Sequence, residues 1–388
     1  MIYLDHNATT RPLPEVIAAM NACMTDDWAN PSSRHAPGQA ARAQIAKARE
    51  AVAALIGARP VEIVFTSGAT ESNHHVLQGA VMRPGTRRRV VLSAVEHAGF
   101  LKHALRMREA GVEVVMLPVD SAGCVSPAAL EDALREDAAL VSVMAANNET
   151  GVLQPVAELA AVARARGVPF HVDATQLVGK LPFDMDALGV DLVSLSAHKL
   201  HGPKGIGALA VRKGLQWPNL LTGTQERGRR GGTENVPGIV GFGVAAACAR
   251  DVLVQESLRQ RMLRERLEAG LFACFGELLA VHGDGAARLP NTSCISVAGF
   301  SADKILDRLE RRGIAAAAGA ACSSGGSEPS HVLMAMGVST SAALGAVRLS
   351  LGRETTEADI VATLIAFESL LEARTDNATQ IPTNGVPR

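Results

Sequence analysis

The strongest constraint on the fold is a series of seven short apolar runs between residues 45 and 250, separated by segments of helical length. The runs read EIVFTS, RRVVLSAVEH, VEVVMLPV, ALVSVMAANNE, PFHVDAT, DLVSLSAH and GALAVRK, with helical stretches such as GFLKHALRMREAG and PVAELAAVARARG between them. Strands that are apolar along nearly their whole length are buried on both faces, and helix-length connections are typical of parallel neighbours. The sequence therefore predicts an α/β fold with a mainly parallel seven-stranded sheet, and functional groups gathered where the strands end.

The pattern of the sequence changes near residue 250. A charged helical stretch, ESLRQRMLRERLEAGLFACF, is followed by NTSCISVAGF, SADKILDRLERRGI and AVRLSLG. We therefore predict a large domain over residues 13–250 and a smaller α+β domain formed by residues 1–12 and 251–375. The polar, proline-containing end of the chain, residues 376–388, is expected to be disordered.

The composition excludes several classes of function. Of 388 residues, 47% are hydrophobic and 20% charged, and the formal net charge is −1, so the charge balance predicts no binding to nucleic acid or to an anionic membrane. Six cysteines, at positions 23, 124, 248, 274, 294 and 322, form no C-x-x-C motif and no Cys/His cluster, so we expect no metal site. The N-terminus MIYLDHNATT has no signal-peptide pattern and no apolar stretch of membrane length is uninterrupted, so we expect a cytoplasmic protein with reduced thiols.

One lysine lies where a buried strand ends, in SLSAHKLHGPKGIG. A lysine taken alone is usually a solvated charge, but Lys199 follows an apolar run directly, and a desolvated lysine can act as an amine nucleophile. The glycine-rich GPKGIG that follows lacks the spacing of a P-loop. The position therefore favours a covalent role for Lys199.

Another strand, in VPFHVDATQ, ends at Asp173, with Gln176 one turn further on. An isolated aspartate at such a position is most often a helix N-cap. It is also the partner that a protonated pyridine nitrogen requires in a dry crevice. A lysine able to form a Schiff base and an aspartate for a ring nitrogen together indicate pyridoxal phosphate.

A third strand end, FTSGATESN, offers a place for the phosphate of such a cofactor. Gly68 allows close approach of the backbone, and the helix that opens at Thr70 presents free N–H groups to an anion. The alternative is an ordinary capping box built on Ser67 or Thr70. His97 also follows a strand, and with Tyr3 the only tyrosine, its imidazole is a plausible stacking plane, although a lone histidine is more often structural.

These motifs, in this order, resemble the cysteine desulfurases, in the aminotransferase class V group of fold-type I pyridoxal-phosphate enzymes. The resemblance extends from YLDHNATT to RLSLGRETTEADI, nearly the whole chain. NNETG, SLSAHKLHGPKG and QERGRRGGTEN make the chain most similar to the nitrogen-fixation branch, the NifS type. The implied fold is a fold-type I transferase with a large cofactor-binding domain and a small domain.

The resemblance implies a set of cofactor contacts. Lys199 would be the Schiff-base lysine and Asp173 the partner of the ring nitrogen, while Gln176 would bond the phenolic oxygen. His97 would stack on the ring and carry protons to and from thiols. The implied phosphate contacts are Ala69, Thr70, Ser196 and His198, with Thr233 from the second subunit of a homodimer.

The resemblance also implies a substrate and a reaction. Asn148 and Arg348 would bind the carboxylate of L-cysteine, Arg348 through a bidentate fork. Cys322 would take the sulfur as a persulfide and leave L-alanine. The sulfur would pass to an iron–sulfur scaffold protein, with nitrogenase maturation as the expected destination.

The surroundings of Cys322, AGAACSSGGSEPSH, consist of small residues that favour a mobile loop able to carry sulfur between sites. An incidental surface cysteine is the alternative for this residue. For the whole chain the alternatives are a selenocysteine lyase, a class V aminotransferase and a non-catalytic scaffold for sulfur-trafficking partners. A transaminase has no need of Cys322, and a scaffold would be expected to lose Lys199, Asp173 or Arg348.

Some features depart from the family pattern or lie outside it. LLTGTQE is one residue shorter than the usual LLxGGxQE, and SSGGSEPSH differs from SSGSLEPSH. His201 lies three residues after His198, but no carboxylate completes a metal site there. The other cysteines are expected to be structural, Cys23, Cys248 and Cys274 in helices and Cys294 in a strand, with Cys124 exposed in a turn. No role is predicted for His6 or Asn7.

Overall fold

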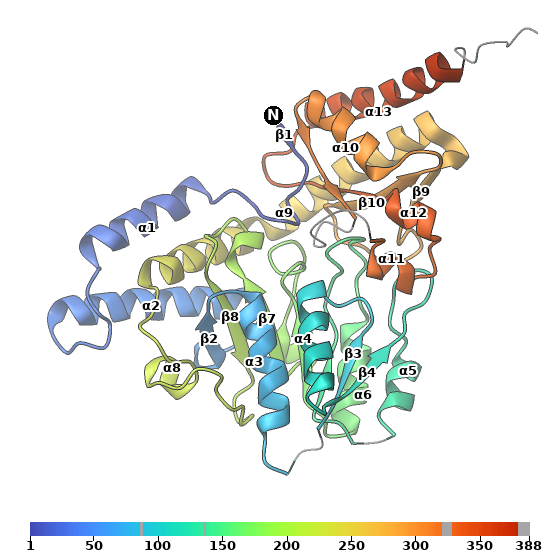
Figure 1. Cartoon of the computed structure of the whole chain (residues 1–388). Helices are drawn as coiled ribbons and strands as arrows, with labels where there is room; N and C mark the ends of the chain where they lie inside the picture. The colour runs from blue at the N-terminus through green and yellow to red at the C-terminus, as the bar shows by residue number, and fades with distance from the viewer. Residues whose placement is uncertain (86–87, 136, 320–327, 379–388) are drawn as a thin grey trace, which may run out of the picture.

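The computed structural model describes residues 1–85, 88–135, 137–319 and 328–378 (Figure 1). Seven strands form one sheet in the order β2-β8-β7-β6-β5-β3-β4. Their bounds are β2 Ile63–Thr66, β3 Arg89–Ser93, β4 Glu113–Leu117, β5 Leu140–Ser142, β6 Phe170–Asp173, β7 Leu192–Ser196 and β8 Gly207–Val211. Each lies in one of the seven apolar runs, so the prediction of an α/β fold with a seven-stranded sheet is confirmed.

The sheet is parallel except at β8, which runs antiparallel to both β7 and β2. The chain between β7 and β8, residues 197–206, is too short for a helical crossover, which takes a dozen or more residues in all. The other strands are joined through helices: α3 Ala69–Met82, α4 Ala98–Glu109, α5 Pro127–Ala133, α6 Val156–Ala165 and α7 Met185–Leu188. The C-terminal ends of β3, β5, β6 and β7 therefore share one edge of the sheet.

Helices cover both faces of this sheet. Successive strand residues alternate between two apolar clusters, so that Val91 and Val193 belong to one cluster and Leu92 and Leu192 to the other. The first cluster includes side chains of α2 Ala36–Leu55, α6 and α9 Val236–Phe275, and the second those of α3 and α4. Burial on both faces explains why the strands are apolar throughout.

A third apolar cluster lies around a smaller antiparallel sheet of order β12-β13-β10-β9. Its strands are β9 Leu279–Val281, β10 Thr292–Val297, β12 Ala317–Ala318 and β13 Val347–Ser350, and its helices include α10 Ala302–Arg311 and α13 Glu357–Ala378. The N-terminus joins this part through β1 Ile2–Tyr3, which pairs with β11 Ile314–Ala315. The short helix α12 Thr340–Leu344 packs against β10 of the small sheet, and α11 His331–Ala335 lies between α12 and the larger sheet, as Figure 1 shows.

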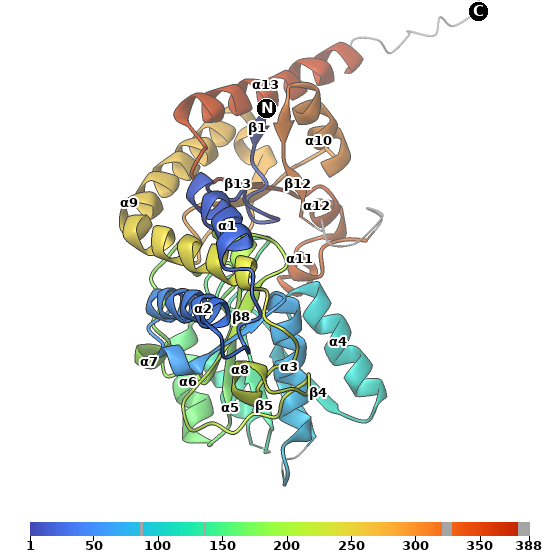
Figure 2. The same cartoon turned by 90° about the vertical axis from the view of Figure 1, so that its left-hand side faces the viewer.

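Helix α9 links the two parts without a break. It passes from α1 Pro14–Asp26 and α2 to α13 (Figure 2). Its first half contributes Phe242 to the cluster of the large sheet, and its second half contributes Leu267 to the cluster of the small sheet. These buried contacts account for an apolar composition that would otherwise suit a membrane span. The boundary predicted at residue 250 falls inside this helix, and the division into domains stays a prediction.

Two smaller expectations are corrected. The disordered tail was expected from residue 376, but α13 continues to Ala378, and residues 379–388 lie outside the described residues. Cys124 is half-buried rather than exposed, because its Sγ lies 3.7 Å from the carbonyl oxygen of Leu153. Cys23, Cys248 and Cys274 lie in helices and Cys294 in β10, as expected.

Candidate active site

A cavity of about 480 Å³ lies at the C-terminal edge of the large sheet, where Arg348 of the small sheet also reaches it. Most of the residues predicted for the site line this one cavity: Ala69, Thr70, His97, Asn148, Asp173, Gln176, Ser196, His198, Lys199 and Arg348. They come from strand ends and loops up to 279 positions apart in sequence (Ala69 to Arg348). The structure thus assembles the predicted positions, while their roles remain to be tested.

Lys199 ends a short 3-10 turn, Ala197–Lys199, that directly follows β7. Its Nζ donates to the backbone oxygens of Asn7, at 2.5 Å, and Ala8, at 2.9 Å. Both acceptors belong to the N-terminal segment, which lines the cavity through Asn7 and Ala8. Two backbone carbonyl oxygens therefore hold the amine at the cavity wall.

Asp173, the last residue of β6, is buried and both of its carboxylate oxygens accept hydrogen bonds. Oδ1 accepts from the backbone N–H of Thr175 at 3.0 Å, and Oδ2 accepts from Nδ2 of Asn73 at 2.7 Å. The Thr175 contact is typical of a cap, but the Asn73 contact fixes the second oxygen from a different element, α3. A carboxylate has about four lone-pair sites, so a further N–H can still be accepted.

The turn before α3 leaves the start of that helix open. The N-cap is Gly68, with a φ of 155° and no side-chain cap, so a complete capping box on Ser67 or Thr70 does not form, although Oε2 of Glu71 accepts from the backbone N–H of Ser67 at 2.7 Å. A side chain on Gly207 of β8 would lie 2.6 Å from the Cα of Gly68, so the two glycines meet backbone to backbone. Free N–H groups at the start of a helix can bind an anion, so the geometry is compatible with the phosphate site, which stays a prediction.

His97 is the N-cap of α4, and its Nδ1 accepts from the backbone N–H of Gly99 at 3.2 Å. This bond places the proton of the neutral ring on Nε2. Burial lowers the pKa of His97, and the charges of Lys199 and His331 lower it further, against the opposing effect of Asp173. The imidazole is therefore neutral near pH 7, which suits both stacking on a ring and proton transfer.

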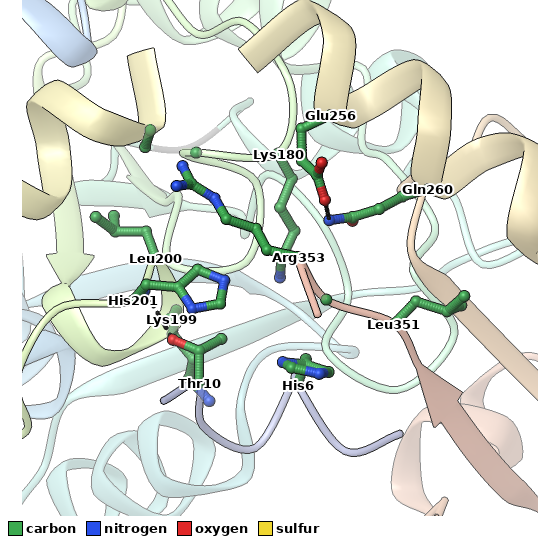
Figure 3. Close-up of a pocket in the computed structure, with 13 residues that line it drawn as sticks. His6, Thr10, Lys180, Lys199, Leu200, His201, Glu256, Gln260, Leu351 and Arg353 are labelled. Atoms are coloured by element: carbon green, nitrogen blue, oxygen red, sulfur yellow. Dashed lines mark hydrogen bonds between the residues drawn. The ribbon is translucent and has the colours of Figure 1, made fainter. Parts of the chain in front are cut away.

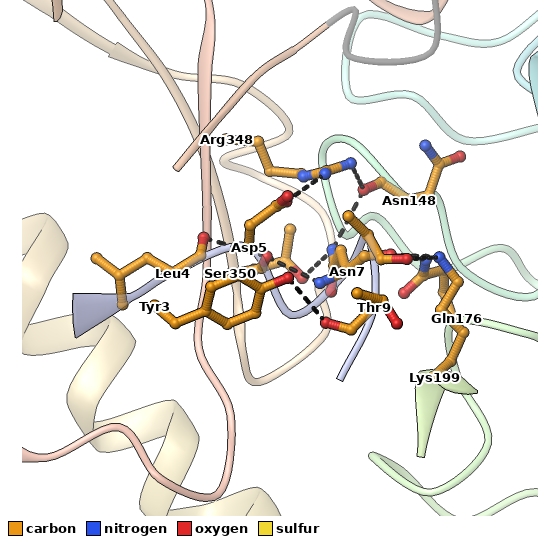
Figure 4. A network of polar contacts seen from close by, with 12 residues as sticks. Tyr3, Leu4, Asp5, Asn7, Thr9, Asn148, Gln176, Lys199, Arg348 and Ser350 are labelled. Atoms are coloured by element: carbon orange, nitrogen blue, oxygen red, sulfur yellow. Dashed lines mark hydrogen bonds and ion pairs between the residues drawn. The ribbon is translucent and has the colours of Figure 1, made fainter. Parts of the chain in front are cut away.

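Arg348 on β13 is only 3% exposed and is held from two sides (Figure 4). Its Nη1 donates to the backbone oxygen of Asn148 at 3.0 Å, and its Nη2 donates to Oδ1 of Asp5 at 2.7 Å. The contact with Asn148 is made by the main chain rather than by the side-chain amide. Nε of Arg348 is buried and has no hydrogen-bond partner among the described residues.

The N-terminal segment reaches the site through Asn7, a residue for which the sequence predicts an approach to the site but no role. The backbone oxygen of Asn7 accepts from Lys199 and from Nε2 of Gln176, at 2.9 Å for Gln176, and its Oδ1 accepts from Lys180 at 3.3 Å. Its Nδ2 donates to Thr292 of β10 at 2.9 Å (Figure 4). Asn7 thus connects the small sheet to the Lys199 wall of the cavity. No local spacing signals these contacts.

Lys180 was missed. Its Nζ donates to Oε1 of Gln176 at 2.8 Å, which fixes the orientation of the Gln176 amide. Burial and the nearby charges of Lys199 and Arg348 hold the pKa of Lys180 well below its ordinary value. A lysine in a loop is usually solvated, so nothing in the sequence marked this one.

A second, much smaller cavity of about 20 Å³ lies on the other side of Lys199 (Figure 3). His6, Lys180, Glu256 and Arg353 are among its lining residues. Burial, with the charges of His201 and Lys180, lowers the pKa of His6 to about 4. This space suits a single water molecule and is too small for a cofactor.

One predicted site residue, Thr233, lies outside the main cavity. Thr233 lines a neighbouring pocket of about 220 Å³ together with Ser67, Gly205 and Arg230. This placement fits a residue that was expected to act on a second subunit. Cys322 lies outside the described residues.

The residues that line the cavity fit pyridoxal phosphate. Its volume of about 480 Å³ is in the usual range for a small-molecule site. Asp173 is a fixed carboxylate for a ring nitrogen, Lys199 supplies an amine, and the open start of α3 supplies N–H donors for a phosphate. Ser196 and His198 lie on the same wall.

Comparison with known proteins gives consistent results. The aminotransferase class-V family model matches residues 2–362. A cysteine desulfurase of Cereibacter sphaeroides is 47% identical over 362 residues, which cover 92% of each chain, and cysteine desulfurase 2 of Trichormus variabilis is 43% identical over 96% of this chain and 93% of its own. Among solved structures, a NifS-like protein superimposes with a TM-score of 0.88 at 36% identity, covering 96% of this chain and 99% of that one. A NifS-like protein from Rickettsia africae gives a TM-score of 0.86 at 33% identity, with the same coverage.

Proposed function

The chain belongs to the aminotransferase class-V family, and on that premise we propose that it is a pyridoxal-phosphate-dependent cysteine desulfurase. The observation that carries the proposal is the identity of 43–47% to cysteine desulfurases over nearly the whole chain. The convergence of Lys199, Asp173 and Arg348 on one cavity supports it. The substrate would be L-cysteine and the carbon product L-alanine.

Several residues would hold the cofactor. Asp173 would bond the ring nitrogen, Gln176 the phenolic oxygen, and the neutral ring of His97 would cover one face. The phosphate would be bound by the N–H groups of Ala69 and Thr70, the side chains of Ser196 and His198, and Thr233 of a second subunit. When bound, pyridoxal phosphate supplies a sink for the electrons left at the substrate Cα once its proton is removed.

Lys199 is the proposed base at the Cα. Its Nζ is held by the backbone oxygens of Asn7 and Ala8, acceptors that keep the amine at the cavity wall when it is not bonded to the cofactor. There Nζ would accept the Cα proton of the substrate and later return a proton to the product. His97 would take the thiol proton at Nδ1, the nitrogen without a proton in the neutral ring, in exchange for the hydrogen bond from Gly99 N–H, since its lowered pKa keeps the ring neutral near pH 7.

Arg348 would bind the substrate carboxylate, and Cys322 would receive the sulfur. The segment that contains Cys322 is entered beside Arg348, because Ala317 of β12 pairs with Arg348 and Gly319 N donates to Ala346 O at 2.9 Å. Atoms and electrons balance without an outside oxidant. The Cys322 sulfur bonds to the substrate sulfur as the Cβ–S bond breaks, the electron pair of that bond stays with the carbon, and a proton completes L-alanine.

The finer assignments follow from the same proposal. A homodimer would bring Thr233 of the second subunit to the phosphate. Its interface would cover the exposed apolar side chains Ile17 and Met24 of α1 and Trp28, which follows α1 and is 76% exposed. The persulfide would pass to an iron–sulfur scaffold protein in the cytoplasm. Supply of sulfur for nitrogenase is the destination suggested by resemblance to the NifS type.

The test is a product assay on the cofactor-loaded protein with L-cysteine and an excess of thiol reductant. A cysteine desulfurase forms L-alanine and sulfide in equal amounts, and Lys199→Ala forms neither. A keto acid instead of L-alanine would favour the aminotransferase alternative. Turnover confined to selenocysteine would favour a lyase, and no turnover with either would favour a scaffold.

A further inference from the structure

We propose that Asp5 is a positioning residue that orients Arg348 to receive the carboxylate of the substrate. The inference rests on the proposed function, and it concerns a residue for which no role was predicted. Asp5 Oδ1 lies 2.7 Å from Nη2 of Arg348, and the Arg348 side chain is only 3% exposed (Figure 4). The ion pair therefore lies at the cavity wall, where the guanidinium has little other freedom.

The backbone is held by hydrogen bonds before and after Asp5. The position from which the Asp5 side chain extends is therefore fixed. Leu4 N donates to Ala315 O at 2.8 Å, and Ser350 N donates to Leu4 O at 2.7 Å. After Asp5, His6 N donates to Ser350 O at 3.2 Å. The segment thus pairs in parallel with β13 at Asp5 and Ser350. Arg348 lies on β13, close to this pair.

The remaining hydrogen-bonding capacity of Arg348 points to a ligand. A guanidinium has five N–H groups, and the described contacts use one on Nη1, toward Asn148, and one on Nη2, toward Asp5. Nε, which is buried, has no partner among the described residues. Nε and the second hydrogen of Nη2 lie side by side in a guanidinium, in the spacing that a carboxylate accepts bidentately.

Asp5 and the Asn148 oxygen therefore hold Nη2 and Nη1, while Nε–H and one hydrogen on each of the two Nη atoms are left for the substrate. Without Asp5, Nη2 would have no fixed acceptor and the plane of the guanidinium could turn. The requirement is for an acceptor at the position of Oδ1. A purely structural role, in which Asp5 tethers the N-terminal segment, makes a different prediction for conservative variants.

The experiment uses the cofactor-loaded protein and two unreactive probes, L-alanine and ethylamine, which is alanine without its carboxylate. Binding of each is followed through the absorbance of the cofactor, for the parent and for Asp5→Asn, Asp5→Glu and Asp5→Ala. Asp307→Ala, which removes an exposed carboxylate paired with Arg311 on α10, is the matched control. Melting temperatures of all variants report on the tether.

We expect Asp5→Ala to weaken the binding of L-alanine at least about tenfold, in line with loss of a charge-assisted hydrogen bond to Arg348. The binding of ethylamine should be unchanged. Asp5→Asn keeps an oxygen acceptor in place and should stay within about threefold of the parent, whereas Asp5→Glu displaces the acceptor and should weaken L-alanine. For turnover, KM for L-cysteine should rise more than kcat falls.

Three outcomes would overturn the proposal. An equal loss of binding for both probes, with lower melting temperatures, would show that Asp5 only tethers the N-terminal segment. A normal Asp5→Glu with a weakened Asp5→Asn would mean that charge, and not position, matters, and this comparison holds even if Asp5→Ala does not fold. A parent protein that binds L-alanine no better than ethylamine would instead refute the carboxylate role of Arg348, and with it that part of the proposed function.

Discussion

Raising the pH through neutrality should destabilise the protein through one buried carboxyl group, that of Glu149. Glu149 lies in the turn after β5 and is 5% exposed. Burial raises its pKa from 4.5 to about 7, although a hydrogen bond donated by Ser330 Oγ and the charge of Arg348 act in the opposite direction. Ser330 is the N-cap of α11, so the group that titrates also holds this helix in place.

The sign and size of the effect follow from the two pKa values. Below pH 4.5 the carboxyl is protonated in both the folded and the unfolded state, and it contributes no pH dependence. Between pH 4.5 and 7 the folded state keeps a proton that the unfolded chain has lost, so each pH unit lowers the free energy of unfolding by about 1.4 kcal/mol. The total loss is about 3 kcal/mol, and it levels off above pH 7.

The assay is urea unfolding at pH 5, 6, 7 and 8, followed by tryptophan fluorescence, for the parent and for Glu149→Gln. The difference between the two proteins isolates this carboxyl, because all other titrating groups are shared. We expect the difference to shift in favour of Glu149→Gln by about 2.5 kcal/mol between pH 5 and 8, since part of the total loss has already occurred at pH 5. Glu131→Gln, at a carboxyl whose side chain is 66% exposed, should give a constant difference. A constant difference for Glu149→Gln as well would refute the reasoning.

Two further predictions concern buried charges. Arg49 and Glu226 form a buried bidentate pair at 2.6 and 2.7 Å. Glu226→Gln should therefore lower the free energy of unfolding, measured in urea, by about 3–5 kcal/mol. A loss below about 1 kcal/mol would contradict this account of the pair. Lys180→Met removes the donor that orients Gln176, so the dissociation constant for pyridoxal phosphate, measured by equilibrium dialysis, should rise about tenfold; an unchanged constant would show that Lys180 does not act through Gln176.

The sheet and one edge of the site could be predicted because the information is local. Apolar runs define the strands, and the ends of parallel strands meet at one edge, so Asp173 and Lys199 fall together once the strands are recognised. His97 follows by the same logic, since it comes just after β3. For these residues the sequence position and the position in space are related by a simple rule.

The N-terminal contribution could not be predicted in the same way. Asp5 meets Arg348 and Asn7 meets Thr292 across more than 280 positions, through a strand of two residues that has no pattern of its own. Lys180 was missed for another reason, since only the fold shows that its amine is enclosed among acceptors. The position of Asn148 was predicted, but not that its backbone oxygen makes the contact.

The domain boundary at residue 250 stays a prediction, and the change of composition there has a structural cause. The pattern changes near residue 250 because α9 leaves one apolar cluster there and enters the other, between Ala249 and Leu263. The hydrogen bonds of a helix continue whichever cluster it faces, so a change of composition need not mark a break in the chain. The change of composition near residue 250 marks where α9 passes from one apolar cluster to the other. It does not mark the end of a helix.

The measurement that tests the central claim most directly is the mass of the peptide that contains Cys322. The cofactor-loaded protein is incubated with L-cysteine without reductant, digested and analysed, beside Lys199→Ala treated in the same way. The account predicts one added sulfur atom on Cys322 in the parent and none in Lys199→Ala. L-Alanine formation with no sulfur on Cys322, or sulfur on Cys322 that does not depend on Lys199, would contradict it.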